Sequence, residues 1–339
     1  MKPKPALTQR DNRTTPLARR GQMIENALMR RGTAAGITER PATRVGPPRG
    51  DGGPPRGDGG APRGDGGAPR GDGGAPRGDG GPPRGDERDV VAVEEPLEIR
   101  VAGDALAITM RTPGDDRELA LGFLHAEGVI QSFADVGSVA HCGRVGDEGF
   151  GNVIDVLPAP GTALAPERVE RSRRGTLVST SCGVCGRLTI DDLTARISPL
   201  TDDAEIPASV LSRCVAELRP LQPVFLRTGG VHAAAIFDVR GNVIVVKEDI
   251  GRHNAVDKAV GSLLLARALP ARGQILVVSG RASFEIVQKA AVAGLSIVAS
   301  VSAASSLAVD LAAKMNITLA AFARDGAMNV YTAPARIVS

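Results

Sequence analysis

Two cysteines in a run of small residues carry the most chemical information in this chain. The run reads Ser-Thr-Ser-Cys-Gly-Val-Cys-Gly-Arg and places thiols at Cys182 and Cys185. A thiol pair at this spacing can hold a metal, form a disulfide or pass sulfur between molecules. Gly183 and Gly186 favour a mobile loop in which a thiol is accessible. The neighbouring Arg187 favours the thiolate, and a CxxC thiol titrates below the value of about 8.5 of a free cysteine.

Three readings of this pair stay open: sulfur or redox chemistry, a zinc site, and no function. A zinc site needs four ligands, and the chain has neither a second CxxC nor a paired His motif. The other cysteines and histidines stand at no spacing that recommends them: Cys142, Cys214, His125, His141, His232 and His253. The sequence His125-Ala126-Glu127 is similar to the His-x-Glu of zinc deaminases. It lies within an amphipathic helical pattern, however, and no Pro precedes Cys182, so we interpret it as accidental.

Four further segments have residue types that suit an anion. Glycines and helix N-termini at strand ends expose backbone N–H groups, and ligands of open α/β sheets gather there. The segments are Arg227–His232, Glu248–Asn254, Ser279–Arg281 and Phe322–Ala327. The alternative for each is a capped helix or a plain turn. Convergence of their arginines would favour a phosphate ligand.

The elements that must position these residues divide the chain after the tail into two patterns. Strands predicted at 90–94, 97–101, 105–111, 136–141 and 152–157 surround a helix at 115–126, in which Asp115 is the expected cap, and make 88–175 a β-rich part. The Gly- and Ser-rich stretch 176–190 is a predicted loop. In 205–339, helices at 208–218, 254–268, 283–293 and 305–316 alternate with a hairpin at 232–247 and strands at 274–279, 296–301, 318–323 and 328–331. This alternation predicts an α/β sandwich with a mixed or largely parallel sheet.

Composition limits the function classes and the location. Residues 46–87 repeat Arg-Gly-Asp-Gly-Gly-Ala/Pro-Pro, lack large apolar side chains and are expected to be a disordered linker. Residues 1–45 hold ten basic and three acidic residues and are expected to be a basic disordered tail. With one Tyr and no Trp, the folded part is a poor candidate for nucleic-acid binding. The uncharged stretch Ala290–Val309 contains five serines, and we interpret it as helix, buried strand and helix rather than a membrane span. Four cysteines without a signal-peptide pattern indicate a cytoplasmic protein with reduced thiols.

Five ordered motifs together resemble the formate dehydrogenase accessory sulfurtransferase family, FdhD. They are Ser179–Arg187, Arg227–Ala234, Asp249–Lys258, Ser279–Ala290 and Phe322–Tyr331. The resemblance covers about 88–338 and leaves 1–87 as an extension. It implies a three-layer sandwich with a mixed sheet, similar to the cytidine deaminase fold, and a homodimer. The chain reads Ala233-Ala234 after His232, without the Glu of the deaminase position, so deaminase chemistry is not expected.

The same resemblance implies a function. Family members take persulfide sulfur from a cysteine desulfurase and transfer it to the molybdenum bis(molybdopterin guanine dinucleotide) cofactor, which formate dehydrogenase requires for activity. Cys182 matches the persulfide cysteine and Cys185 its partner, with no permanent metal. The segment that matches the contact with the bound cofactor is Phe322, Ala323, Arg324, Asp325, Gly326 and Ala327. Two alternatives are a zinc-dependent hydrolase on a deaminase-like fold and a cofactor-binding chaperone without sulfur transfer. No nucleic acid and no membrane are expected among the partners.

Overall fold

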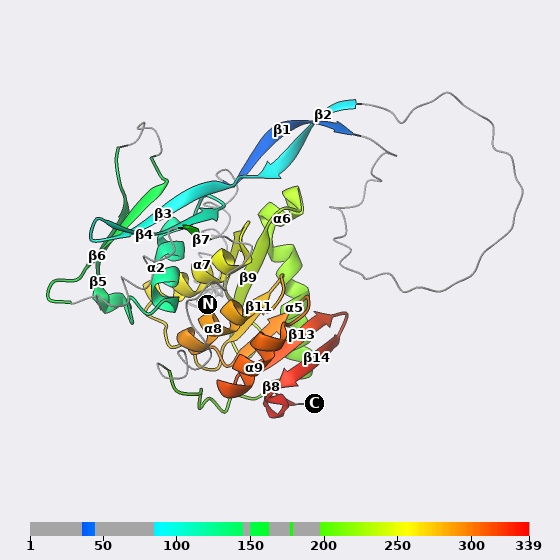
Figure 1. Cartoon of the computed structure of the whole chain (residues 1–339). Helices are drawn as coiled ribbons and strands as arrows, with labels where there is room; N and C mark the ends of the chain where they lie inside the picture. Colours follow the sequence, from blue (N-terminus) through cyan, green and yellow to red (C-terminus); the bar gives the residue numbers. More distant parts are fainter. Residues whose placement is uncertain (1–35, 45–84, 145–149, 163–176, 179–196, 339) are drawn as a thin grey trace, which may run out of the picture.

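The computed structural model describes residues 36–44, 85–144, 150–162, 177–178 and 197–338 of the 339-residue chain (Figure 1). The helices in this part are α2 (Asp116–Ala126), α5 (Ala208–Leu218), α6 (Pro223–Thr228), α7 (Arg252–Leu265), α8 (Phe284–Ala293) and α9 (Ser306–Lys314). Short 3-10 turns lie at Phe133–Asp135, Arg219–Leu221 and Pro334–Arg336.

A mixed six-stranded sheet forms the larger half, in the order β10-β9-β11-β12-β13-β14. Its strands are β9 (His232–Phe237), β10 (Val243–Asp249), β11 (Ile275–Val278), β12 (Ile297–Ser300), β13 (Thr318–Arg324) and β14 (Ala327–Thr332). The three central strands β11, β12 and β13 run parallel, and they are flanked by the antiparallel strands β9 and β14. β9 forms a hairpin with β10, and β14 forms one with β13. The predicted hairpin and the predicted alternation of strands and helices are therefore confirmed.

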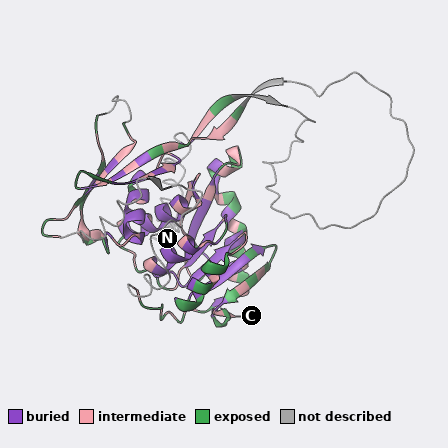
Figure 2. Cartoon of the chain, viewed as in Figure 1, coloured by how far each residue is buried: buried purple, intermediate pink, exposed green. Residues whose placement is uncertain are grey.

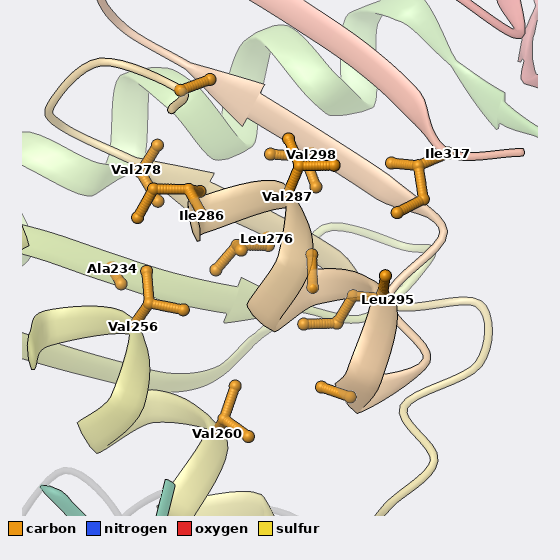
Figure 3. Packing of buried hydrophobic residues seen from close by; sticks show 14 of the residues in the cluster. Ala234, Val256, Val260, Leu276, Val278, Ile286, Val287, Leu295, Val298 and Ile317 are labelled. Carbon is orange, nitrogen blue, oxygen red and sulfur yellow. The ribbon is translucent and has the colours of Figure 1, made fainter. Parts of the chain in front are cut away.

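Helices cover both faces of this sheet and make three layers. On one face, α7, α8 and α9 enclose a core that includes Val256, Leu276 and Val287 (Figure 3). On the other face, α5 packs Leu211 and Cys214 against the sheet. The inner strands β9, β11 and β12 are buried on both sides, and they are largely purple in Figure 2, whereas the edge strand β14 is mostly exposed or half-buried. This double burial explains why the uncharged stretch Ala290–Val309 contains β12 between two helices. No helix among the described residues is long and apolar enough to span a membrane.

A second sheet forms the smaller half, in the order β5-β6-β3-β4-β7. It consists of β3 (Glu95–Val101), β4 (Asp104–Arg111), β5 (Val136–His141), β6 (Val153–Pro158) and β7 (Leu177–Val178). Helix α2 packs on it and also against α7 of the larger half. The two helices touch at glycines: a Cβ added at Gly261 would lie 1.9 Å from the carbonyl oxygen of Glu118, and one added at Gly122 would lie 1.9 Å from that of Asp257. Only a residue without a side chain permits this approach.

An antiparallel ribbon of β1 (Ile37–Arg44) and β2 (Gly85–Ala92) corrects the expected disorder of 1–45 and 46–87 at residues 37–44 and 85–87. The two strands pair along their full length, and most of the repeats lie between them in the chain, the last one running into β2. The base of the ribbon is held to the body, since Val93 N–H donates to the Gly36 carbonyl and Gly36 lies beside Thr112. Composition missed this pairing because it joins segments separated by forty residues. The rest of the expected tail and linker lies outside the described residues.

Three smaller elements complete the comparison with the sequence. The structure adds α6 and a two-stranded parallel pair, β8 (Ile206–Pro207) with β15 (Ile337–Val338), which no pattern predicted. The expected cap of α2 is wrong: Asp115 makes no side-chain cap bond and has a left-handed backbone. Its carboxylate instead accepts a hydrogen bond from Lys247 Nζ at 2.7 Å.

Candidate functional site

Most of the motifs that the sequence singled out lie at one end of the large sheet, where the parallel strands finish. We call this end the sheet edge. The register places Asp249 at the end of β10 opposite His232 at the start of β9. Next to them, β11 ends at Val278, which pairs with both Ala234 and Ser300. The loop Ser279–Ser283 and the β13–β14 turn follow strands that end at this same edge. Segments that the sequence singled out for an anion therefore lie at one end of the sheet, where ligands of open α/β sheets bind.

The Arg252 side chain lies at this edge and has a nitrogen atom without a hydrogen-bond partner among the described residues. Arg252 is the first residue of α7, and its Nε atom is buried without any hydrogen-bond partner in the structure. Burial and the neighbouring charge of Arg281 lower the pKa of Arg252, although a guanidinium stays charged at neutral pH. Two adjacent cations with an unused donor make a favourable place for an anion.

Gly280 lies beside both His232 and the base of the Arg252 side chain. A Cβ added at Gly280 would lie 3.2 Å from His232 Nδ1, so a larger residue would crowd the imidazole, and it would touch the Arg252 Cβ at an ordinary 3.5 Å. Burial, and then the charge of Arg252, lower the pKa of His232. The imidazole is therefore neutral at pH 7 and adds a polar group to the edge without adding positive charge.

The last residues of β13, just before its turn to β14, present an exposed aromatic side chain. Phe322 is 42% exposed, and its backbone is left-handed, with φ of 53°. A register shift between Ala321 and Arg324 turns this part of β13 outward, and the Phe322 N–H donates to the Ser302 carbonyl. Arg324, Asp325, Gly326 and Ala327 are exposed as well, whereas Ala323 is buried in the core. Of the six residues predicted to contact a cofactor, five are thus accessible.

A buried polar network fixes α7 behind Arg252. Lys258 Nζ lies 2.7 Å from the Asp249 carboxylate, and both side chains are essentially inaccessible. The same carboxylate accepts hydrogen bonds from the N–H groups of Thr112 and Gly251. Asn254 Nδ2 donates to Asp249 and to the Met110 carbonyl. This network ties the start of α7 to the end of β4, and therefore to the smaller half.

The predicted reactive cysteines, Cys182 and Cys185, lie outside the described residues. The nearest described residue before them is Val178, whose backbone pairs with Thr109 of β4. The Thr109 hydroxyl lies 3.2 Å from Asn254 Oδ1, in the first turn of α7. Four residues of fully extended chain span at most about 14 Å, which bounds the distance from Val178 to Cys182. The chain leading to the CxxC motif is therefore anchored beside the helix that carries Arg252.

The other two cysteines differ from these in their surroundings. Cys214 is fully buried in the core under α5, and burial raises the pKa of its thiol to about 11. Cys142 is partly exposed at the end of β5, and both thiols are free. Within the described segments, no group of three or more His, Cys, Asp or Glu could hold a metal ion.

Two sequence motifs have structural roles. They are Arg227–His232, considered as an anion site, and His125-Ala126-Glu127, considered as a zinc site. Arg227 lies in the last turn of α6, and Gly229 ends that helix with a left-handed backbone, so the glycine pair there is a helix C-cap. His125 is buried in α2, as expected for core packing. Sequence reasoning missed the buried network of Asp249, Asn254 and Lys258. The signal that could have found it is three polar residues around the start of α7, five and four positions apart in the chain.

The fold and this edge define a mixed α/β protein with a cationic, aromatic-bearing site at the strand ends. Comparison with known proteins gives the family: residues 92–338 match the FdhD/NarQ family. The chain belongs to this family. It is 55% identical over 250 residues to the sulfur carrier protein FdhD of Anaeromyxobacter dehalogenans (strain 2CP-C), covering 72% of this chain and 87% of that protein.

One further relative supports this assignment, and a solved structure supports the fold. The sulfur carrier protein FdhD of Mycolicibacterium paratuberculosis is 48% identical over 253 residues, covering 74% of this chain and 92% of that protein. A crystal structure from Desulfotalea psychrophila, described as that of a formate dehydrogenase accessory protein, superposes with a TM-score of 0.62 at 24% identity. It covers 89% of this chain and all of that one, and the likeness supports the fold.

Proposed function

We propose that this chain is a sulfur carrier that takes persulfide sulfur from a cysteine desulfurase and delivers it to the molybdenum bis(molybdopterin guanine dinucleotide) cofactor for formate dehydrogenase. Relatives that are about half identical to it over some 250 aligned residues are named sulfur carrier proteins. The observation that carries the cofactor part is the sheet edge, where the buried, unpartnered Nε of Arg252 lies beside Arg281. The same edge ends in the exposed Phe322.

These residues fit a phosphate-bearing nucleotide as substrate. A guanidinium with a free donor forms charge-assisted hydrogen bonds to phosphate oxygens. An exposed aromatic ring provides a flat apolar surface on which a nucleobase stacks. Arg252 and Arg281 would then meet the phosphate groups, and the turn Phe322–Ala327 would contact the base. We infer that the three-layer arrangement is related to that of cytidine deaminases, with a homodimer as the working form.

The sulfur step is assigned to Cys182, with Cys185 as its partner. The Cys182 thiolate attacks the outer sulfur of the donor persulfide, a new S–S bond forms, and the S–S bond of the donor breaks. The donor leaves as a thiolate, so this exchange needs no oxidant or reductant. Val178 pairs with Thr109, whose hydroxyl contacts Asn254, and this supports delivery from the following loop toward the sheet edge.

The first test is mass spectrometry of the full chain after incubation with a cysteine desulfurase and cysteine. We expect the peptide that contains Cys182 to gain one sulfur atom. The Cys182→Ala chain should lose this gain and fail to activate formate dehydrogenase, while Cys214→Ala, which removes a buried thiol, should keep both. Normal activation by Cys182→Ala would refute the sulfur step.

A second test addresses the nucleotide part separately, with guanosine diphosphate as the probe. Loss of one charge-assisted hydrogen bond costs about 1.5–3 kcal/mol, so Arg252→Gln should weaken binding roughly 10- to 100-fold. Arg213→Gln, on the exposed side of α5, is the matched control and should bind as the unchanged chain does. Equal affinity of the two variants would argue against Arg252 as a phosphate contact. A zinc-dependent hydrolase would instead contain one zinc per chain, lost with Cys185→Ser, and a chaperone without sulfur transfer would tolerate alkylation of both thiols.

A further inference from the structure

A serine, a histidine and a glutamate form a hydrogen-bonded chain where α7 and α8 begin. His253 Nε2 lies 3.1 Å from Ser283 Oγ, and His253 Nδ1 lies 2.9 Å from Glu285 Oε2. His253 is the second residue of α7, whereas Ser283 immediately precedes α8 and Glu285 is in its first turn. The side chains of His253 and Glu285 are 12% and 22% exposed, so the group is screened from solvent but not sealed.

The environment sets which ring nitrogen carries the proton. Burial lowers the pKa of His253, so its ring is neutral at pH 7. Burial alone would raise the pKa of Glu285, but the hydrogen bond from His253 and the nearby positive charges outweigh it and lower that pKa. An ionised carboxylate can only accept, so Nδ1 carries the proton and Nε2 presents its lone pair to the Ser283 hydroxyl. This is the tautomer in which a histidine can accept a serine proton.

A second serine in the same fold shows what Ser283 would do as an ordinary helix cap. Ala282 and Ala304 pair in a parallel bridge, and each is followed by the serine that precedes a helix. Ser305 accepts a hydrogen bond from the Ala308 N–H at 3.3 Å and so caps α9. Ser283 makes no cap bond, and its hydroxyl meets His253 instead. The first N–H groups of α8 therefore lack both an intrahelical acceptor and a side-chain cap.

We propose that Ser283 is a nucleophile for acyl transfer from carboxylic esters, with His253 as its general base and Glu285 as a positioning residue. Ser283 Oγ bonds to the ester carbonyl carbon while its proton moves to His253 Nε2. The C–O bond to the alcohol then breaks, and the alcohol leaves with that proton. Water attacks the acyl group with His253 again as base, which releases the acid and restores the hydroxyl. The free N–H groups at the start of α8 are suited to the oxyanion that forms in both steps.

The surrounding charge selects the class of ester. Arg252 precedes His253 in the chain, and Arg281 lies two residues before Ser283. The two guanidinium groups outnumber the Glu285 carboxylate, so the potential around the hydroxyl is positive and the preferred substrate carries a negative charge close to its ester bond. This inference does not depend on sulfur transfer, because neither Cys182 nor Cys185 takes part in any step.

The test uses the full-length chain with an alkyl fluorophosphonate, which reacts with activated serines, and peptide mass spectrometry. We expect an adduct on Ser283, its loss in His253→Ala, and its retention in Ser305→Ala, the matched serine. In a second assay, the acetate ester of a fluorescent hydroxycoumarin bearing a carboxylate should be cleaved faster than that of its uncharged methyl analogue. Thiols also react with such esters, so the rate assigned to this site is the difference between the unchanged chain and Ser283→Ala. Removal of the base should lower that difference by about 10²- to 10⁴-fold.

Glu285→Gln separates a positioning role from a purely structural one. It should lower the Ser283-dependent rate and change its pH profile while leaving the circular dichroism spectrum unchanged. If Ser283→Ala does not fold, Ser283→Cys provides the second variant, since it should make this position reactive toward iodoacetamide. The proposal is overturned if a known serine esterase is labelled under the same conditions and Ser283 is not, or if the Ser283-dependent rate is zero.

Discussion

Lys258→Met is the substitution that most directly tests how the site is held. Lys258 Nζ lies 2.7 Å from Asp249 Oδ2, with exposed fractions of 1% and 0% for the two side chains. Methionine has nearly the same length but no charge, so the change leaves the Asp249 carboxylate buried without its cation. Breaking a buried ion pair from one side costs about 3–5 kcal/mol.

The lower end of that range is expected here, because three hydrogen bonds still stabilise the carboxylate. They come from Thr112 N–H, Gly251 N–H and Asn254 Nδ2 at 3.1, 2.8 and 3.0 Å. Against this, the lysine also donates to the Thr112 carbonyl at 2.8 Å, and that bond is lost. We therefore expect a loss of about 3 kcal/mol, or a fall in Tm of roughly 6–12 °C for a domain of this size.

The assay is guanidinium denaturation followed by circular dichroism, with Lys247→Met as the control. Lys247 lies 2.7 Å from Asp115, but that carboxylate is 41% exposed and keeps its water when the cation is removed. The control should lose no more than about 1 kcal/mol. In the Asp249→Asn/Lys258→Met chain, the combined loss should be smaller than the sum of the single losses by about 1–3 kcal/mol. Equal losses for the two lysine variants would refute the view that this buried pair holds α7 in place.

Three further substitutions or conditions test other parts of the structure. Gly261→Ala should destabilise the protein by about 1–3 kcal/mol, because the added Cβ would clash with the Glu118 carbonyl. The same change in a solvent-exposed helix stabilises, so a more stable variant would contradict the contact between the two helices. The buried Cys214 thiol should resist iodoacetamide at pH 8, and its raised pKa should make the free energy of unfolding fall as pH rises from about 9 to 11, a fall that Cys214→Ala reduces. The hydrogen bond to Asp116 raises the pKa of His141, so His141→Gln should cost about 1 kcal/mol below pH 6.5 and less as pH rises through that raised pKa; a loss that is the same at pH 6 and pH 9 would contradict this pairing.

The sheet edge could be predicted from the sequence because strand direction follows from chain order. Two apolar strands joined by a helix run parallel to each other. The Ser279–Arg281 loop and the turn after β13 each follow such a strand, so both lie at the same end of the sheet. A hairpin partner runs the opposite way and brings His232 to that side. This reasoning needs only the type of each element and its position in the chain.

What could not be predicted depends on how elements approach each other in space. Ser283 and His253 are thirty residues apart, and a serine before a helix normally predicts a cap, as it does correctly at Ser305. The ribbon of β1 and β2 was missed for the same reason, since its pairing crosses a long low-complexity stretch. Asp115 failed as a cap because its backbone is left-handed and Lys247 approaches from another strand.

Hydrogen bonds of the Asn254 side chain join the two halves of the protein at the start of α7. Its side chain contacts Asp249 within the larger half and both Met110 and Thr109 of β4 in the smaller half. Each such hydrogen bond contributes about 1 kcal/mol net, and an unpaired buried amide costs more than that. The start of α7, which carries Arg252 and His253, therefore cannot move relative to β4 without breaking several bonds. Because β7 pairs with that same strand, the backbone that leads to Cys182 and the guanidinium proposed to bind the cofactor are fixed by one set of contacts.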